Sequence, residues 1–413
     1  MSKTQPSNRD FPAGSPPRLG RTFIQDPHTL YRRLRAQSAV HRVTLWGGTD
    51  VWLVTRYAEA KAALTDPRLS KDWRGVMELY PTGGDGPHQA LLYSHMLLQD
   101  PPDHTRLRKL VALAFTGRTV QKMRPDIIRI ADELLEAMAV GGPGPVDLMQ
   151  CYAVQLPLRV ISELLGVPPE DRDEFRVRVE PLLTSADPAE LGPAESAMAE
   201  LLAALIDRKR KLPAGDLLSA LVHTADVQDR LSPDELLSTA FLLIVAGYET
   251  TVNLIGNGVL ALLRNPSQLA SLRSDPSLLP RAVDEFLRFE SPLNTSTQRF
   301  TSEPVRIGGV EIPAGELVLI ALLAANHDDR QYDDPDRLDV SRARNPHLAF
   351  GHGIHHCLGA PLARLEGEIA IGRLLDRFER ITLVNKVVLQ YRRSTLMRGL
   401  DTLPVYLGDN GPQ

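Results

Sequence analysis

The sequence predicts a mainly α-helical protein that carries a small β region. Apolar residues recur at helical spacing over most of the 413 residues, as expected of helices that bury one face. Two short segments, residues 41–54 and 305–312, have β-type patterns interrupted by a glycine pair, which is typical of β-hairpins. Residues 317–320 predict one further short strand.

The clearest helix signal begins at Ser232. Pro233 suits the first helical position, and Glu235 can complete a capping box with the Ser232 side chain. No proline follows until Pro266, so a helix of about 30 residues fits, near the upper end for globular proteins. Its apolar middle predicts that this helix crosses the centre of the molecule.

Composition and charge limit the class of protein. Hydrophobic residues make up 43% of the chain, enough for a large core, and length alone suggests two or three domains of about 100–200 residues. A net charge of −4, from 47 basic and 51 acidic residues, indicates neither nucleic acid nor an anionic membrane as a partner. The two cysteines, Cys151 and Cys357, allow no disulfide framework and are typical of a reducing cytoplasm.

Neither a signal peptide nor a membrane anchor is expected. The N-terminus is polar, and the most apolar run, residues 241–247, is much shorter than the roughly 20 residues that span a bilayer. Residues 1–20 are rich in Pro, Gly and Ser and predict a flexible arm. Residues 73–98 and 182–193 are rich in glycine or proline and predict irregular loops, which often act as lids.

One stretch, residues 350–359, concentrates chemistry around Cys357. Its three glycines let the backbone fold tightly and approach a flat ligand, and the helix predicted to follow can stabilise a thiolate at its start. A buried structural cysteine is one interpretation. A zinc site is another, given four histidines between residues 347 and 356, although no second Cys/His pair stands out. The third is an axial thiolate on haem iron.

The pattern Phe350-Gly-x-Gly-x-His-x-Cys-x-Gly359 resembles the haem-binding loop of the cytochrome P-450 family. The resemblance extends in the family's order across nearly the whole chain. It implies a mainly α cytochrome P-450 fold, in which residues 21–413 form a single triangular helical domain with a small β region. This expectation replaces the two or three domains suggested by length.

The resemblance also implies which residues bind haem b. Cys357 is the expected iron ligand. His104 and Arg108 lie four residues apart on one predicted helix face, which suits an anion, although a solvated basic face gives the same pattern. In the family these positions hold the haem propionates. The other residues expected around the haem are Phe350, Gly351, Gly359, Arg299 and His355.

A second pair matches a structural element of the family. Glu285 and Arg288 lie three residues apart on a predicted helix, and such a pair alone contributes little. By resemblance it is the family's buried Glu-x-x-Arg pair, which fixes the core around the haem loop. Arg337 is the expected third member, although the residues that flank it differ from the family's pattern.

The long helix carries a carboxylate beside a hydroxyl, Glu249 and Thr250, in an apolar setting. Burying such groups is costly unless they are used, and Gly247 together with a Thr hydroxyl can open a groove for water or dioxygen. A satisfied polar turn is the alternative. By resemblance, Glu249 relays protons and Thr250 hydrogen-bonds the dioxygen. Tyr248 stands where relatives often carry histidine.

The resemblance implies a monooxygenase that inserts one atom of O2 into its substrate, by hydroxylation of a C–H bond or by epoxidation. Peroxide-driven oxidation or a rearrangement is the alternative chemistry, and the intact acid–alcohol pair argues against it. Electrons are expected from NAD(P)H through a ferredoxin reductase and a ferredoxin, in a cytoplasmic monomer. Five basic residues are expected to form a patch that docks the ferredoxin: Arg106, Lys109, Arg342, Arg344 and Arg364. The alternative interpretation is that they are scattered, solvated surface charges.

The chain resembles actinobacterial enzymes that oxidise macrolides, other polyketides or sterol-like molecules. A bulky hydrophobic natural product such as a macrolide is the expected substrate, and a terpenoid or sterol-like molecule is the alternative. A haem-binding or zinc-binding protein without turnover is the alternative from another class. The hydroxyl-rich segment 293–297 is interpreted as a match for an oxygenated substrate. The residues expected to line the pocket are Leu242, Val245, Ala246, Leu293, Asn294, Thr295, Thr395 and Leu396.

Overall fold

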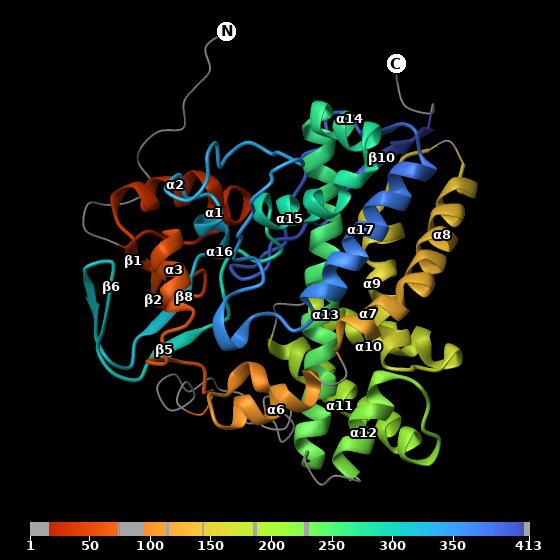
Figure 1. Cartoon of the computed structure of the whole chain (residues 1–413), viewed down its shortest axis with the longest axis horizontal. Helices are drawn as coiled ribbons and strands as arrows, with labels where there is room; N and C mark the ends of the chain where they lie inside the picture. The colour runs from red at the N-terminus through yellow and green to blue at the C-terminus, as the bar shows by residue number, and fades with distance from the viewer. Residues whose placement is uncertain are drawn as a thin grey trace.

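The longest element of the molecule is a helix, α13 (Pro233–Arg264). Figure 1 shows it running through the helical side of the molecule, with helices from both halves of the chain around it. α13 packs against helices that come before and after it in the sequence, so the predicted central helix is present. The computed structural model describes residues 16–72, 74, 94–112, 115–142, 144–184, 188–226 and 231–408.

α13 begins and extends as predicted. The Glu235 N–H donates to the Ser232 hydroxyl at 3.1 Å, and the Ser232 N–H donates to the Glu235 carboxylate at 2.9 Å. This capping box satisfies donors that the helix start would otherwise leave free, and the helix runs for 32 residues. α13 is long and apolar enough to cross a membrane, but 72% of its most apolar window is buried inside the protein. α13 is therefore a helix of the protein core.

Most of the other helices pack around α13, whereas α1, α2, α3 and α16 lie beside the β strands (Figure 1). Within the described ranges, five short 3-10 or π turns lie between them. The α helices are α1 (Arg21–Gln25), α2 (Pro27–Gln37), α3 (Tyr57–Ala63), α6 (Asp103–Ala112), α7 (Gly117–Lys122), α8 (Arg124–Val140), α9 (Gln155–Leu164), α10 (Arg172–Thr184), α11 (Pro188–Lys211), α12 (Leu217–Asp226), α14 (Pro266–Ser274), α15 (Leu279–Phe289), α16 (Leu322–Ala325) and α17 (Ala360–Arg377). The short turns are η1 (Met96–Leu98), η2 (Met149–Ala153), η3 (Pro169–Asp171), η4 (Pro276–Leu278) and η5 (Gly353–His355).

Both predicted hairpins are present. β1 (Val40–Thr44) pairs antiparallel with β2 (Asp50–Val54), and β6 (Val305–Ile307) pairs with β7 (Val310–Ile312). The predicted single strand, β8 (Leu317–Ile320), runs parallel to β2 in a five-stranded sheet of order β1-β2-β8-β5-β3. The remaining strands are β3 (Leu69–Ser70), β5 (Arg299–Thr301), β4 (Val146–Asp147), β9 (Ile381–Leu383) and β10 (Pro404–Leu407).

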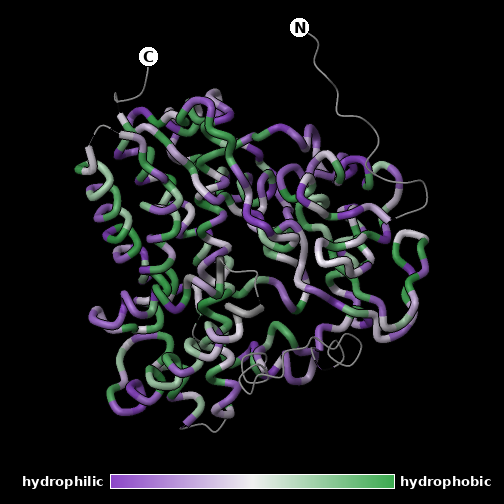
Figure 2. Tube along the Cα trace, turned by 180° about the vertical axis from the view of Figure 1, so that it is seen from behind, coloured by the Kyte–Doolittle hydropathy of each residue, from purple (hydrophilic) through white to green (hydrophobic). Residues whose placement is uncertain are grey.

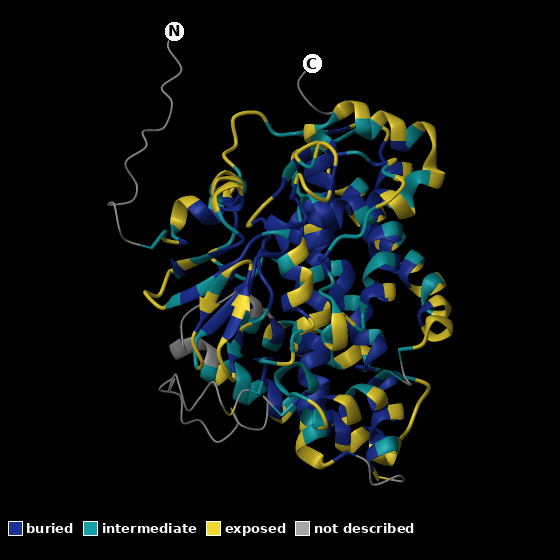
Figure 3. Ribbon diagram, turned by 60° about the vertical axis from the view of Figure 1, so that its left-hand side comes forward, coloured by how far each residue is buried: buried dark blue, intermediate teal, exposed yellow. Residues whose placement is uncertain are grey.

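The core forms because the outer helices are amphipathic. Figure 2 shows hydrophobic and hydrophilic residues alternating along the helices, and Figure 3 shows exposed residues on their outer faces with buried residues between them. In α8 the buried residues recur at the three- and four-residue spacing of one helix face. They are Ile127, Ile130, Ala131, Leu134, Leu135 and Met138.

Residues 182–193 differ from the predicted loop, because most of them are helical. α10 continues to Thr184 and α11 begins at Pro188. Proline at the first helical position costs no hydrogen bond, so Pro188 starts a helix instead of ending one. Of the predicted loop 73–98, residue 73 and residues 75–93 lie outside the described residues.

The predicted arm, residues 1–20, is described only from residue 16 onward. Leu19 is fully buried, and its N–H donates to the Thr44 carbonyl oxygen at 2.8 Å. Arg18 forms an isolated bridge with the same residue of β1. The last residues of the predicted arm are therefore packed on the sheet.

Candidate functional site

Cys357 lies at the end of a tight loop, shortly before α17. Gly351 and Gly353 have positive φ angles of 70° and 74°, which side chains with a Cβ rarely adopt. A Cβ on Gly353 would also lie 2.8 Å from the Thr65 side chain. The Cys357 N–H donates to the Phe350 carbonyl oxygen at 2.9 Å. The loop therefore closes on itself and fixes the place of the cysteine.

Cys357 combines accessible surface with a deep position among protein atoms. Its side chain is exposed by accessible surface, yet it lies so deep among protein atoms that burial raises the pKa of the thiol. Accessible surface together with a deep position is expected of a side chain that lines an internal cavity. The N–H groups of Gly359 and Ala360 and the Arg108 guanidinium lower that pKa. A metal cation at the sulfur would supply the rest of the stabilisation that a thiolate needs.

Two histidine rings lie together beside this loop. The ring of His104, on α6, and the ring of His355 have centroids 4.3 Å apart. Both ring nitrogens of His104 and Nε2 of His355 are buried without a well-formed hydrogen bond. Burial lowers the pKa of both imidazoles. Since buried polar atoms are nearly always paired in folded proteins, these nitrogens mark a place where a polar group of a ligand fits.

Three further cations border the two histidines. Arg108, one turn after His104 on α6, donates to the His356 carbonyl oxygen at 2.7 Å. Arg299, on β5, donates to two backbone carbonyl groups, but its buried Nε has no partner. Lys71 follows β3 and is brought beside Arg299 by the pairing of β3 with β5. It is buried and donates to the Thr297 hydroxyl.

This basic cluster has more positive than negative charge. Asp100 is the carboxylate whose charge acts on Lys71 and Arg299. Burial lowers the pKa of Lys71 to about 7 and that of Arg299 to about 10, so neither cation is fully compensated. Uncompensated buried charge is strongly unfavourable. The cluster of Lys71, His104, Arg108, Arg299 and His355 therefore suits an anionic ligand.

The middle of α13 is accessible although most of the helix is buried. Ala246 and Gly247 are exposed, and Val245 and Thr250 are partly so. The Thr250 hydroxyl donates to the Ala246 carbonyl oxygen at 2.9 Å, and the Thr251 hydroxyl donates to that of Gly247 at 3.1 Å. Such bonds bend helices and loosen their backbone hydrogen bonds. The middle of α13 is therefore an accessible stretch in a helix that is otherwise mostly buried.

Glu249 is the buried acid of this stretch. Burial raises the pKa of its carboxyl group to about 7, and the nearby Arg392 guanidinium limits the rise. The closest atoms of the two side chains, Arg392 Nη1 and Glu249 Oε1, are 3.8 Å apart. At neutral pH the carboxyl group is therefore partly protonated, as a group that passes protons needs to be.

The two C-terminal pocket segments expected from the sequence lie side by side. The Asn294 N–H donates to the Leu396 carbonyl oxygen at 2.8 Å, and Leu293 forms a bridge with Met397. Leu293, Leu396 and Thr395 are partly accessible, whereas Asn294 is buried. The other two residues expected to line the pocket, Leu242 and Thr295, are also buried. Together with Val245 and Ala246, the accessible wall is mainly apolar.

The hydroxyl groups of segment 293–297 are partly used within the protein. The Ser296 hydroxyl donates to the Thr297 carbonyl oxygen at 3.0 Å and accepts from the Ile320 N–H at 3.3 Å. The Thr297 hydroxyl accepts from Lys71. Ser296 and Thr297 therefore do not support the interpretation that this segment matches an oxygenated substrate.

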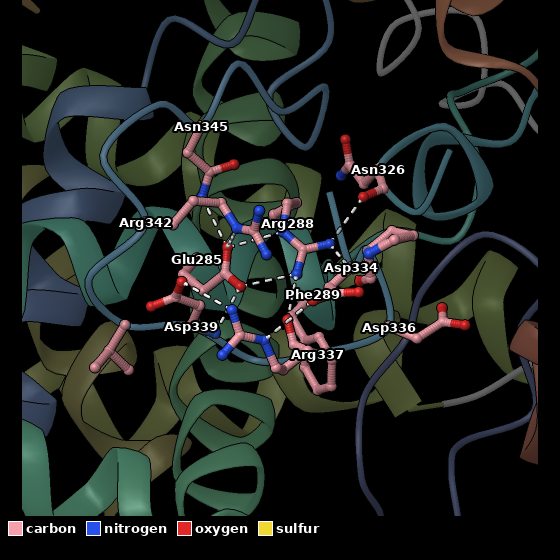
Figure 4. A network of polar contacts seen from close by, with 12 residues as sticks. Glu285, Arg288, Phe289, Asn326, Asp334, Asp336, Arg337, Asp339, Arg342 and Asn345 are labelled. Carbon is pink, nitrogen blue, oxygen red and sulfur yellow. Dashed lines mark hydrogen bonds and ion pairs between the residues drawn. The ribbon is translucent and has the colours of Figure 1, made fainter. Parts of the chain in front are cut away.

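Glu285 and Arg288 of α15 form a fully buried ion pair, as predicted (Figure 4). Both side chains are 0% exposed. The Arg288 guanidinium donates to both carboxylate oxygens of Glu285 at 2.8 Å. It also donates to the carbonyl oxygens of Asn326 and Pro335 at 3.0 and 2.7 Å. The pair is therefore satisfied on every side, which a buried ion pair requires.

The third side chain of this network is Arg342, so the expectation for Arg337 is wrong. Arg342 Nε donates to Glu285 at 3.1 Å, and its side chain is 12% exposed. The Arg337 side chain is 62% exposed. Arg337 forms long ion pairs with Asp334 and Asp339, at 3.8 and 3.7 Å, and contacts the buried pair only through its carbonyl oxygen, which accepts from Arg288 at 3.2 Å. The Arg337 side chain therefore lies at the edge of the network, and the chain reaches Glu285 itself at Arg342 (Figure 4).

The network continues into the cysteine loop. Asn345 Nδ2 donates to Glu285 at 3.1 Å. The Leu348 N–H donates to the Asn326 side chain at 2.7 Å, two residues before Phe350. Asn326 is also bound by Arg288 through its carbonyl oxygen. The buried ion pair thus anchors the segment that leads to Phe350.

Three site residues were not singled out from the sequence. Lys71 and Arg392 depend on contacts between distant strands and turns, for which no local signal exists. Glu366, on α17, is buried, its Oε2 has no partner, and burial raises its pKa well above the ordinary value. A carboxylate in the apolar helix directly after Cys357 was a usable signal, by the same reasoning that identified Glu249.

Comparison with known proteins decides the family. The family model "Cytochrome P450" matches residues 194–399. Vitamin D(3) 25-hydroxylase of Pseudonocardia autotrophica is 50% identical over 389 residues, which cover 94% of this chain and 95% of that protein. The 6-deoxyerythronolide B hydroxylase of Saccharopolyspora erythraea is 46% identical over 396 residues, 94% and 97% of the two chains. The chain belongs to the cytochrome P450 family.

The fold of this P450 agrees with that of a solved relative. The P450 monooxygenase TamI bound to tirandamycin C superposes with a TM-score of 0.89 and 48% identity, covering 95% of this chain and 100% of that chain. The predicted mainly α P450 fold is confirmed, and the chain is a P450 monooxygenase. Family members use a haem-thiolate and O2.

The residues of this P450 fit a haem. The accessible sulfur of Cys357 suits an iron ligand, and the unpaired donors of the basic cluster suit two carboxylates. A zinc site has less support, because no group of three His, Cys, Asp or Glu side chains able to hold a metal ion occurs among the described residues.

Proposed function

We propose that this P450 hydroxylates a bulky hydrophobic natural product, such as a macrolide or another polyketide, with haem b held by Cys357. The observation that supports this proposal is that Cys357 keeps accessible surface deep inside the protein, near the unpaired nitrogens of the basic cluster. When bound, the haem supplies the chemistry that activates O2 and transfers one oxygen atom to a C–H bond. The remaining tasks fall to the protein.

In this proposal the basic cluster binds the propionates of the haem. His104, Arg108, Arg299 and His355 are the residues that the family resemblance assigns, and Lys71 adds a fifth donor. Charge-assisted hydrogen bonds to carboxylates are stronger than neutral ones. Phe350, Gly351 and Gly359 would border the haem near Cys357. The Phe350 ring is itself fixed by the Arg364 guanidinium, which lies 4.6 Å from the ring centroid.

Glu249 and Thr250 supply protons in the proposed reaction. The Thr250 hydroxyl donates to the Ala246 carbonyl oxygen, and its lone pairs can accept from a water in the accessible stretch of α13. Glu249, with a pKa of about 7, can give up a proton and take up another near neutral pH. The apolar residues around them limit the entry of further water, which protects the reaction from leakage.

The apolar wall supports a hydrophobic substrate, and the relatives narrow its class. The 6-deoxyerythronolide B hydroxylase and the P450 bound to tirandamycin C favour a macrolide or related compound. The second candidate is a sterol-like or terpenoid molecule, favoured by the 50% identity with vitamin D(3) 25-hydroxylase. Both classes present a large apolar body to the accessible residues Val245, Ala246, Leu293 and Leu396.

We further propose that electrons pass from NAD(P)H through a ferredoxin reductase and a ferredoxin to this P450. We also propose that the P450 is a monomer in the cytoplasm. Three of the five expected docking residues are engaged within the protein, since Arg342 pairs with Glu285, Arg106 with a glutamate of α13 and Arg364 with Asp284. Lys109 and Arg344 remain for a basic patch that attracts an acidic partner.

The test is turnover with a ferredoxin, its reductase, NADPH and isotopically labelled O2, on macrolides and on sterol-like compounds. We expect a macrolide product with one labelled oxygen atom, and NADPH use that needs the ferredoxin. The same reaction without the ferredoxin is the control. Labelled product from the sterol-like compounds alone would replace the substrate class with the second candidate. Oxygen that enters the product from water would contradict monooxygenation.

A further inference from the structure

Arg392 approaches the buried acid of α13 from a segment near the C-terminus. We propose that Arg392 is a positioning residue that attracts the Glu249 carboxylate and thereby controls when this acid carries a proton. The inference rests on the proposed function, in which Glu249 supplies protons to the reaction. The inference gives a role to Arg392, which lies outside α13 and outside the loop of Cys357.

The contact between the two side chains is partly shielded from water. Arg392 Nη1 lies 3.8 Å from Glu249 Oε1, and the side chains are 18% and 9% exposed. Charges in such surroundings attract each other more strongly than on an open surface. The distance is longer than a hydrogen bond, so the cation attracts the carboxylate without locking it in place. Among the described residues, Arg392 is the ion-pair partner of Glu249.

The backbone that carries Arg392 is held firmly. The Arg392 N–H donates to the Gly399 carbonyl oxygen at 2.9 Å, and the bridge between Tyr391 and Leu400 closes the turn. Asn257 Nδ2, on α13, donates to the Arg398 carbonyl oxygen at 2.8 Å. The turn is therefore tied to the same helix that carries Glu249. The guanidinium reaches the acid from a fixed base, unlike a mobile surface side chain.

The electrostatics of Glu249 depend on two opposing causes. Burial raises its pKa to about 7, and the Arg392 charge lowers it. No other described charge contributes to this balance. Glu366 lies on α17, which packs against α13, and its own pKa is raised by burial alone. Removing the Arg392 charge leaves only the effect of burial, so the Glu249 pKa must rise.

The same turn also forms part of the proposed substrate wall. Thr395 and Leu396 lie three and four residues after Arg392, and Leu396 accepts a hydrogen bond from the Asn294 N–H at 2.8 Å. The turn that carries Arg392 is therefore continuous with the segment that the proposed substrate contacts. This continuity connects the wall of the pocket to the source of protons.

The test is an infrared pH titration of the carboxylic acid band of Glu249 in the resting holoprotein, assigned by its loss in Glu249→Gln. In Arg392→Gln we expect the midpoint to rise by about one pH unit, the low end for loss of a nearby opposite charge. Arg392→Lys keeps the charge and should keep the midpoint close to that of the unchanged protein. Arg393→Gln changes the exposed neighbour and should leave the midpoint unchanged.

An unchanged midpoint in Arg392→Gln would overturn the inference, as would an equal shift in Arg393→Gln. A purely structural role would alter stability without moving the midpoint in this pattern. The titration needs no substrate and no turnover. A protein that fails to hydroxylate would therefore refute the proposed function and leave this measurement valid.

Discussion

Replacing Arg288 by alanine is expected to lower the free energy of unfolding by about 3–5 kcal/mol. The substitution leaves the Glu285 carboxylate buried at 0% exposure without its main partner. It also frees the carbonyl oxygens of Asn326 and Pro335, which Arg288 binds. Urea unfolding of the holoprotein, followed by circular dichroism, measures this loss. We expect part of the protein to lose its haem, since Asn326 anchors the segment that leads to Phe350.

Arg342 and Arg337 form the matched comparison for this prediction. Arg342→Ala removes a bond to buried Glu285 and should be clearly destabilising. Arg337→Ala removes a side chain that is 62% exposed, and it should change the free energy of unfolding by no more than about 0.5 kcal/mol. Equal losses in the two variants, or a larger loss in Arg337→Ala, would contradict the assignment of Arg342 to the network.

A Glu249→Gln variant is expected to form product about a hundredfold more slowly, the lower range for loss of a group that transfers protons. Glutamine keeps the size of the side chain but carries no exchangeable acid proton. Consumption of O2 should continue, because the variant leaves the haem ligand and its surroundings intact. The ratio of product formed to O2 consumed is the quantity to measure. An unchanged ratio would show that Glu249 is not the proton source.

The pH dependence of the same reaction shows whether the protonated or the ionised form of Glu249 supports product formation. The Glu249 pKa is raised to about 7, so the protonated form dominates below that pH and is lost above it. Product formation per O2 consumed should therefore fall as the pH rises through about 7 in the unchanged protein. In Glu249→Gln the step in this pH range should be absent. A step that persists in the variant would assign it to another group.

Features encoded by neighbouring residues could be predicted from the sequence. The capping box of Ser232 and Glu235, the length of α13 and the glycine turns of both hairpins depend on residues close in the chain. The pair of Glu285 and Arg288 lies on one helix face for the same reason. The loop of Cys357 was recognisable because its glycines and cysteine have a fixed spacing.

Features that depend on distant contacts could not be predicted in this way. Whether Arg337 or Arg342 meets Glu285 is decided by how the segment after α16 turns around Arg288. Lys71 joins the basic cluster only because β3 pairs with β5. Arg392 meets Glu249 across 143 residues of sequence, since the C-terminal turn is tied to α13. Proline content also misled the prediction for residues 182–193, where Pro188 begins a helix.

The central claim, that Cys357 supplies a thiolate to haem iron, is tested most directly by one spectrum. We expect the dithionite-reduced protein to show, on addition of carbon monoxide, the red-shifted Soret band that thiolate ligation produces. Cys357→Ala should lose this band, and Cys151→Ala, which removes the other cysteine, should retain it. A band at the position typical of histidine-ligated haem in the unchanged protein, or a thiolate band that survives in Cys357→Ala, would contradict the account.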